Sequence, residues 1–222
     1  MFSIILIAAV SYGLGSIPFG YILVRIFRNE DVRQSGSGNI GATNVARKSP
    51  VLGAITLVLD AAKGSTAVAF ARHLSVPGPP FSPWAAPHFL MSLAALFAVF
   101  GHVFSFFLKF RGGKGVATAL GSFALIAPKA VLVAVAIFVL VLLIFRYVSM
   151  GSIIAVAAFP ILAWVFHEYG NSPGALAFMA MSSLLIISRH HANIRRLTAG
   201  TEHRFRSKRN SESAAAPPRS RS

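Results

Sequence analysis

Long apolar segments separated by short polar stretches dominate the hydrophobic pattern of this chain. Residues 2–24 carry no charge, and Arg25 and Arg28 follow them. A cleaved secretory signal has its positive charge before its apolar core, so this arrangement predicts a retained first helix. After a polar loop at residues 28–49, further runs typical of membrane helices follow. The second apolar run ends at Ala71. Later runs cover residues 88–108, 129–145, 151–166 and 173–188.

Residues 115–127 are too short for an ordinary membrane span. Between Lys114 and Lys129 they give about 20 Å of helix, against a hydrocarbon core of roughly 30 Å. If they dip in and return, the chain has six spans and its basic tail lies outside. If they cross, there are seven spans, and every Lys and Arg except Lys63, Arg72 and Lys129 lies on one side. Because Lys and Arg in short loops stay cytoplasmic, we predict seven spans, the fourth short or tilted and buried, with the N-terminus outside and the C-terminus cytoplasmic.

Composition agrees with a membrane protein and argues against a soluble basic domain. Hydrophobic residues make up 55% of the 222 residues and charged residues 12%, while Lys and Arg number 21 against 6 Asp and Glu. The net charge of +15 therefore arises mainly from missing acids. We predict an all-α, polytopic helix bundle over residues 1–202, followed by a basic, disordered cytoplasmic tail at 203–222. The Pro-rich stretch at 77–87 suits an external loop, and the lack of Cys excludes disulfides and a Cys acyl-enzyme.

Three polar clusters interrupt the apolar chain, and the predicted topology places all of them on the cytoplasmic face. They are Ser35–Arg47, Gly101–Thr118 and Arg189–Glu202. The first contains G-x-G-x-x-G, but no strand precedes it and Asp60 falls in an apolar run, so a dinucleotide site is excluded. A Gly-rich backbone can still surround an anion, and Arg47 offers a planar charged fork for phosphate. The alternative is a turn capped by Ser and Asn. Further side-chain donors in this cluster are Ser37, Asn39, Thr43 and Asn44.

The second cluster centres on Lys114, which Gly112, Gly113 and Gly115 surround where the short fourth span begins. A Gly-flanked Lys at a helix start predicts a phosphate site, because free N–H groups and the positive end of the helix dipole meet there. His102 lies further back in the third span and is either a hydrogen-bonded core residue or a functional one. The neighbouring Lys109 and Arg111 are expected to contact lipid head groups.

The third cluster begins where the last helix leaves the membrane. His190, Asn193 and Arg196 follow one another at intervals of three, so on a continuing helix they share one face. The alternative is a basic segment that only contacts anionic lipid. In the second span, Asp60 and Lys63 are three apart at membrane depth. They form either a neutralised pair that stabilises the bundle or a substrate contact.

Several catalytic patterns are excluded. His167-Glu168 has Asn171 where a zincin helix requires its second His. No G-x-S-x-G elbow occurs, and no Asp follows a His by five positions. No metal site is predicted.

The three clusters resemble the motifs of the bacterial acyl-phosphate:glycerol-3-phosphate acyltransferase family of small integral membrane enzymes. The matching stretches are, in chain order, GSGNIGATNVAR, GHVFSFFLKFRGGKGVAT and HHANIRRLTAGTE. Similarity also lies in SYGLGSIPFGYILVR of the first span and in LDAAKG at residues 59–64. The resemblance extends from about residue 11 to residue 202 and omits the basic tail.

The resemblance implies acyl transfer from an acyl phosphate to the 1-hydroxyl of sn-glycerol 3-phosphate, giving lysophosphatidate and inorganic phosphate for phospholipid synthesis. Ser37, Arg47, Lys114 and Asn193 would hold phosphate groups, with His190 at the reacting hydroxyl. The implied catalytic residues are His190, Asn193 and Ser37. The implied supporting residues are Asn39, Thr43, Asn44, His102, Gly112, Gly113 and Glu202.

The resemblance also implies a multi-pass protein of the bacterial cytoplasmic (inner) membrane that needs no cofactor. Its partners would be the two substrates, membrane lipids and an enzyme that produces acyl phosphate, but not nucleic acid. His190 acts as general base or orients the hydroxyl, and proton uptake by the leaving phosphate is the competing mechanism. Other function classes are a transporter or flippase for an organic phosphate, and a membrane-anchored nucleic-acid binder acting through the tail. The polar groups gather on one face and no inverted repeat is found, which disfavours a transporter.

Overall fold

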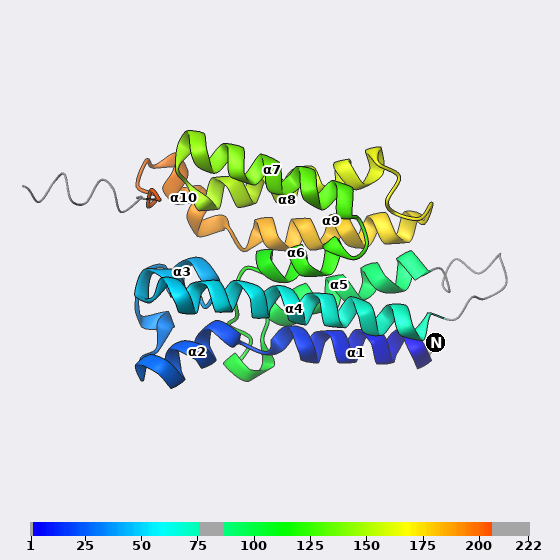
Figure 1. Cartoon of the computed structure of the whole chain (residues 1–222), viewed down its shortest axis with the longest axis horizontal. Helices are drawn as coiled ribbons and strands as arrows, with labels where there is room; N and C mark the ends of the chain where they lie inside the picture. Colours follow the sequence, from blue (N-terminus) through cyan, green and yellow to red (C-terminus); the bar gives the residue numbers. More distant parts are fainter. Residues whose placement is uncertain (1, 76–86, 206–222) are drawn as a thin grey trace, which may run out of the picture.

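The computed structural model describes residues 2–75 and 87–205, and every regular element within these residues is helical (Figure 1). The elements in chain order are α1 Phe2–Ser16, α2 Phe19–Arg28, η1 Val32–Gln34, α3 Ala42–Lys48, α4 Pro50–Leu74, α5 Pro87–Val103, η2 Phe106–Leu108, α6 Val116–Ala124, α7 Pro128–Phe145, α8 Val148–Val165, α9 Pro173–Ser188 and α10 His191–Thr198. The all-α prediction is confirmed over the described residues. The tail beyond residue 205 and most of the Pro-rich stretch at 77–87 lie outside them.

Within residues 2–75 and 87–205, five segments are long and apolar enough to cross a membrane. They are Phe2–Arg28, Pro50–Leu74, Pro87–Leu108, Pro128–Phe145 and Val148–Val165. Helix α9 has 16 residues and α6 has nine, so both are shorter than these five. The predicted count of seven spans is therefore supported in part, by a helical membrane-type bundle with five full-length candidates.

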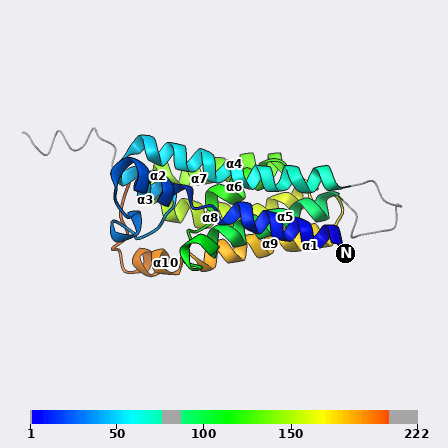
Figure 2. The same cartoon turned by 90° about the horizontal axis from the view of Figure 1, so that it is seen from below.

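The long helices lie side by side, and the short polar elements gather at one end of the bundle. In Figures 1 and 2, α2, α3 and α10 lie at the left-hand end, whereas α1 begins at the right-hand end. Helix α6 runs back toward the right before α7 returns to the left. The short fourth segment thus changes direction as a crossing helix would, although it lacks the length to span a bilayer alone.

The first apolar run forms two helices rather than one. The expected single helix over residues 2–24 is interrupted at Ile17 and Pro18, and α2 continues to Arg28. Proline has no backbone N–H and disturbs the preceding turn, which frees carbonyl groups. The side chain of Lys63 on α4 satisfies one of them, because its Nζ donates to the Ile17 carbonyl at 2.7 Å.

Helix α6 is packed tightly against α4 through glycines. A Cβ on Gly64 would lie 2.2 Å from the carbonyl oxygen of Thr118, and one on Gly121 would lie 2.0 Å from that of Ala61. Small residues allow membrane helices to approach this closely. On its other side Phe123 stacks on Phe159 of α8, with 4.6 Å between ring centroids. The buried position predicted for this short segment is confirmed, and it fixes the start of α6 deep within the bundle.

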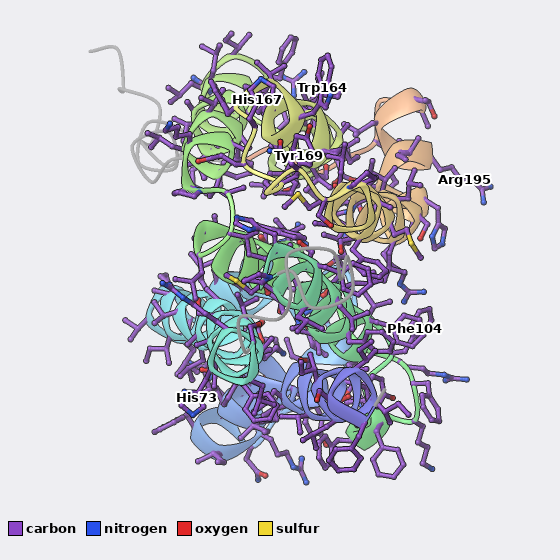
Figure 3. All side chains as sticks on the ribbon, turned by 90° about the vertical axis from the view of Figure 1, so that its right-hand side faces the viewer. His73, Phe104, Trp164, His167, Tyr169 and Arg195 are labelled. Atoms are coloured by element: carbon purple, nitrogen blue, oxygen red, sulfur yellow. The ribbon has the colours of Figure 1, made fainter. Side chains whose placement is uncertain are left out.

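The opposite end of the bundle is closed by polar capping and aromatic residues. The Glu168 carboxylate accepts hydrogen bonds from the backbone N–H groups of Lys129 at 3.1 Å and Ala130 at 2.8 Å, so it caps the start of α7. Figure 3 looks along the bundle from this end and shows Trp164 and Tyr169 near each other. Aromatic side chains of this kind are typical of membrane–water interfaces.

Candidate active site

The Gly-rich cluster at the left-hand end is organised by one buried asparagine, Asn44 of α3. Its Nδ2 donates to the carbonyl oxygens of Val32, Ser35 and Asn39 at 2.8–3.1 Å, and its Oδ1 accepts from the backbone N–H of Ser37 at 3.0 Å. Gly36, between two of these contacts, has a φ of +60°. The side chain of Asn44 is therefore fully occupied in shaping the loop and is not available to a substrate.

This arrangement leaves the other donors of the loop facing outward. The Asn39 side chain accepts from the Gly41 N–H at 2.8 Å, so it too holds the backbone. Ser37 and Thr43 are exposed, and neither side chain makes a hydrogen bond within the described residues. The exposed Arg47 guanidinium lies over Gly36, with Nη1 3.2 Å from where a Cβ on that glycine would stand. The loop thus offers Ser37 and Arg47, while Asn39 and Asn44 form its frame.

The second cluster forms a tight loop that presents Lys114. The N–H groups of Gly112 and Gly113 donate to the carbonyl oxygens of Val103 and His102, each at 3.0 Å. A Cβ on Gly113 would lie 2.2 Å from His102 Nε2, so the imidazole packs directly against the glycine backbone. Gly115 caps α6 with a φ of +89°. The glycines are needed because backbone and imidazole fill the space where side chains would stand.

Lys114 is joined to the third cluster through Asn193. Its Nζ donates to Asn193 Oδ1, and Asn193 Nδ2 donates to Glu202 Oε1 at 2.6 Å. The same carboxylate accepts from Arg196 Nε at 2.7 Å and from Ser149 Oγ at 2.7 Å. Although burial raises the pKa of Glu202, these three donors hold it below its ordinary value. Glu202 therefore stays ionised and fixes the direction of the Asn193 amide.

Ser149, at the start of α8, is a site residue that the sequence patterns did not single out. It lies 53 positions from Glu202 and belongs to no cluster of polar residues. The only signal for it is a hydroxyl in the first turn of a span, directly after Arg146 and Tyr147.

His190 is buried, with 2% of its surface exposed. Its Nδ1 lies 2.8 Å from the carbonyl oxygen of Ile186, and since a carbonyl can only accept, Nδ1 carries the proton. Burial, together with the charge of Lys114, lowers the pKa of His190 to about 4. The imidazole is thus neutral at physiological pH and keeps a free lone pair on Nε2.

One expectation about this cluster is wrong. The chain does not continue as a single helix through His190 and Asn193: α9 ends at Ser188, and α10 begins at His191. His190 instead occupies the turn between the two helices, with a φ of −94°. His190 and Asn193 both lie near Lys114, but a helix break brings them there rather than a shared helical face.

Cations outnumber anions where the three clusters meet. Burial lowers the pKa of Lys114 to about 8, Glu202 opposes this, and the charges of Arg196, Arg47 and Arg189 lower the pKa further. Arg47 belongs to the first cluster and the other two to the third, so their effect on Lys114 shows that all three clusters lie within electrostatic reach of one another. The sequence-based prediction that the polar islands converge is supported by this geometry.

Asp60, Lys63 and His102 form a separate group inside the bundle, each no more than 4% exposed. Lys63 Nζ lies 2.8 Å from Asp60 Oδ1, and His102 Nδ1 lies 3.6 Å from the same oxygen. Thr118 Oγ1 of α6 lies 3.2 Å from His102 Nδ1. These contacts correspond to the neutralised pair that stabilises the bundle. His102 also touches Gly113 and so connects this group with the Lys114 loop.

Comparison with known proteins gives consistent results along almost the whole chain. A family model described as glycerol-3-phosphate acyltransferase matches residues 5–200. A glycerol-3-phosphate acyltransferase of Syntrophotalea carbinolica is 47% identical over 92% of this chain and 98% of its own. The one from Geobacter sulfurreducens is 42% identical over 93% of this chain and 100% of its own.

Solved structures of a similar fold are also found. The crystal structure of PlsY, an integral membrane glycerol 3-phosphate acyltransferase, in its glycerol 3-phosphate form superposes with a TM-score of 0.83 at 32% identity. It covers 96% of this chain and 100% of that one. The lysophosphatidic acid form gives a TM-score of 0.78 at 32% identity over 92% of this chain and 96% of the other.

Proposed function

The chain belongs to the glycerol-3-phosphate acyltransferase family of integral membrane enzymes, and we propose that it uses an acyl phosphate as donor. The acyl group is transferred to the 1-hydroxyl of sn-glycerol 3-phosphate, which yields lysophosphatidate and inorganic phosphate. Related structures in glycerol 3-phosphate and lysophosphatidic acid forms support the acceptor and the product. The observation that carries the donor is the surplus of cations around Lys114, which suits two phosphate-bearing substrates rather than one.

The residues that hold phosphate are Ser37, Arg47, Lys114 and Asn193. Arg47 and Ser37 present donors that have no partner among the described residues, from a loop whose backbone Asn39 and Asn44 hold by hydrogen bonds. Lys114 donates to Asn193 in this structure, and its ammonium can turn to a phosphate oxygen, while the second N–H of Asn193 Nδ2 can donate without the amide leaving Glu202. Two anions that repel one another need fixed cations to bring them together, and prior positioning accounts for much of the rate in such reactions.

In this proposal His190 accepts the proton of the acceptor hydroxyl. Its Nδ1–H is held by the Ile186 carbonyl, which leaves Nε2 as the base. The hydroxyl oxygen attacks the carbonyl carbon of the mixed anhydride, Nε2 takes the hydroxyl proton, and the C–O bond to phosphate then breaks. A pKa of about 4 makes the free imidazole a weak base. Proton uptake by the departing phosphate is therefore the competing route.

The remaining predicted residues support this set. Asn39 and Asn44 shape the first loop, and Glu202 orients Asn193. Gly112, Gly113 and His102 hold the Lys114 loop against α5. Thr43 is exposed and forms no side-chain hydrogen bond within the described residues, so its role rests on the family resemblance alone.

The proposed location is the bacterial cytoplasmic membrane, with the site on the cytoplasmic face and seven passes in all. The separation of α1's start from α10 at opposite ends of the bundle supports an external N-terminus and a cytoplasmic C-terminus. A cysteine introduced at His203 tests this, because the chain has no other cysteine. Labelling by a membrane-impermeant maleimide should require opened membranes, and labelling of intact cells would overturn the topology. An enzyme that produces acyl phosphate remains a proposed partner.

The donor is tested with purified protein in detergent. Radiolabelled glycerol 3-phosphate is supplied with palmitoyl phosphate, with palmitoyl-coenzyme A, or with no donor, and lysophosphatidate and free phosphate are measured. We expect product only with the acyl phosphate, with one phosphate released per acyl group transferred. Product with the thioester alone would refute the donor. Uptake of glycerol 3-phosphate into sealed vesicles without any product would favour the transporter.

A further inference from the structure

Arg189, in the turn between α9 and α10, is a cation with no assigned partner. Its Nε is buried and has no hydrogen-bond partner among the described residues, and no ion pair involves its guanidinium. Buried donors are nearly always satisfied, and a guanidinium carries five of them. A half-buried guanidinium whose Nε is buried and unpaired, beside an enzyme's substrate site, points to an anion that arrives with the substrate.

The surroundings of Arg189 differ from those of the other arginines near Lys114. Arg196 is neutralised by Glu202, with 2.7 Å between Nε and Oε2. Arg47 extends over the exposed Gly-rich loop. Arg189 instead lies against an aromatic ring, since its guanidinium carbon is 5.8 Å from the centroid of Phe104. Three arginines lower the pKa of Lys114 through their charge. Since Glu202 neutralises Arg196, Arg47 and Arg189 are the two that can each bind a phosphate.

Phe104, directly after α5, ends a row of aromatic rings that begins on that helix. The centroid of Phe100 is 4.8 Å from that of Phe104 and 6.5 Å from that of Phe97. Phe100 is 41% exposed on the outside of the bundle, where a membrane protein meets lipid. In Figure 3, Phe104 lies at the periphery of the bundle between α1 and α9. A ligand can thus approach Arg189 from the lipid side along an apolar surface, whereas it reaches Arg47 from water.

These features match the two substrates of the proposed function, on which this step rests. Glycerol 3-phosphate is small and water-soluble, whereas an acyl phosphate carries its phosphate at the end of a lipid chain. We propose that Arg189 binds the phosphate of the acyl donor, with Phe104 fixing the plane of the guanidinium, and that Arg47 serves glycerol 3-phosphate. Arg189 is then a residue that determines donor binding separately from acceptor binding.

Arg189→Gln tests the assignment, with Arg195→Gln as the matched control. Arg195 is exposed on α10, forms no side-chain hydrogen bond or ion pair within the described residues, and points away from the bundle in Figure 3. Loss of a charge-assisted contact should raise the KM for palmitoyl phosphate about 10- to 100-fold in Arg189→Gln. The KM for glycerol 3-phosphate should stay within about twofold. Arg195→Gln should change neither value by more than about twofold.

A binding measurement that needs no turnover separates this assignment from the donor chemistry. Dodecyl phosphate, which cannot transfer an acyl group, is titrated by calorimetry into wild type and both variants. We expect weaker binding to Arg189→Gln alone, even if wild type proves to use another donor. Equal binding by all three proteins would overturn the role of Arg189, as would a parallel rise of both KM values. If Arg189→Gln does not fold, Arg189→Lys and Phe104→Leu receive the same titration, and unchanged binding by both would overturn it.

Discussion

Two groups of charged side chains in this bundle follow opposite rules. The inner cluster, Asp60, Lys63 and His102, lies among the helices, and its cation and anion are in direct contact. The outer cluster lies where the loops meet, and it contains four cations but one carboxylate, which pairs with Arg196. It consists of Arg47, Lys114, Arg189, Arg196 and Glu202. Charge in the inner cluster is balanced within the protein, whereas charge in the outer cluster is balanced only when an anion binds.

This difference separates stability from function. A charge inside a membrane bundle is costly unless it is paired, and losing one partner leaves the other exposed to that cost. Surplus cations in the outer cluster repel one another, so they oppose folding slightly and favour ligand binding. Substitutions in the inner cluster should therefore lower the free energy of unfolding, whereas substitutions in the outer cluster should lower activity without lowering stability.

The largest effect is expected from breaking the inner pair. Lys63→Met leaves Asp60 without its partner and the Ile17 carbonyl without its donor. We expect a loss of about 3–5 kcal/mol in the free energy of unfolding. SDS titration in mixed micelles measures it. The double variant Asp60→Asn/Lys63→Met should recover at least half of the loss, and a double variant as unstable as Lys63→Met would show that charge balance is not the reason.

The outer cluster should lose activity without losing stability. Lys114→Ala and Arg47→Ala should each lower kcat/KM about 10²-fold or more, because they remove stabilisation of phosphate in the transition state. The unfolding midpoint should remain unchanged or rise, since a repelling charge is gone. Steady-state assays with thermal unfolding of the same samples measure both quantities. Near-normal kcat/KM in both variants would refute the phosphate assignment.

Substitution of Asn44 should lower both stability and activity, because its side chain holds the frame of a functional loop. Asn44→Ala leaves three carbonyl oxygens and the N–H of Ser37 without their partner. We expect about 1–3 kcal/mol of destabilisation and a loss of kcat/KM on the order of tenfold. Gln34→Ala, on the same loop and exposed, is the matched control. Equal stability of the two variants would exclude a framework role.

The last prediction concerns the pH dependence of kcat/KM. Since the pKa of Lys114 is lowered to about 8, its charge is lost at a lower pH than that of an ordinary lysine, and kcat/KM should fall above about pH 8. In Lys114→Arg this fall in kcat/KM should move beyond pH 10, because a guanidinium stays charged. His190, with a pKa of about 4, should add no limb between pH 7 and 10. Profiles from pH 7 to pH 10, where the substrate phosphate is largely dianionic, test both statements.

Periodicity and charge predict much of this architecture because membrane spans are long and their flanking charges are asymmetric. The hydrophobic pattern predicts the all-helical class and the buried short helix α6. The number of spans fixes the side of the membrane on which each loop lies, and so predicts that the three polar islands converge. The family resemblance then supplies residue roles that spacing alone leaves open, such as those of Asn193 and Glu202.

The features that could not be predicted depend on contacts between distant residues. The helix break before Pro18 depends on a distant residue, because Lys63 of α4 satisfies the freed carbonyl of Ile17. Ser149 joins the site only because α8 begins beside Glu202. Arg189 resembles a juxtamembrane charge in sequence, and only its buried Nε and the ring of Phe104 distinguish it from Arg195.

The short length of α6 has a consequence for the donor's path. Its nine residues begin further from the left-hand end of the molecule than α2, α3 and α10 do (Figure 1), and Lys114 comes two positions before its first residue, Val116. An amphiphile with its chain in hydrocarbon would otherwise have to rise toward water, and each methylene withdrawn costs about 0.8 kcal/mol. A phosphate-binding lysine next to this set-back helix start would let the acyl chain stay in the hydrocarbon while the water-soluble substrate moves to it.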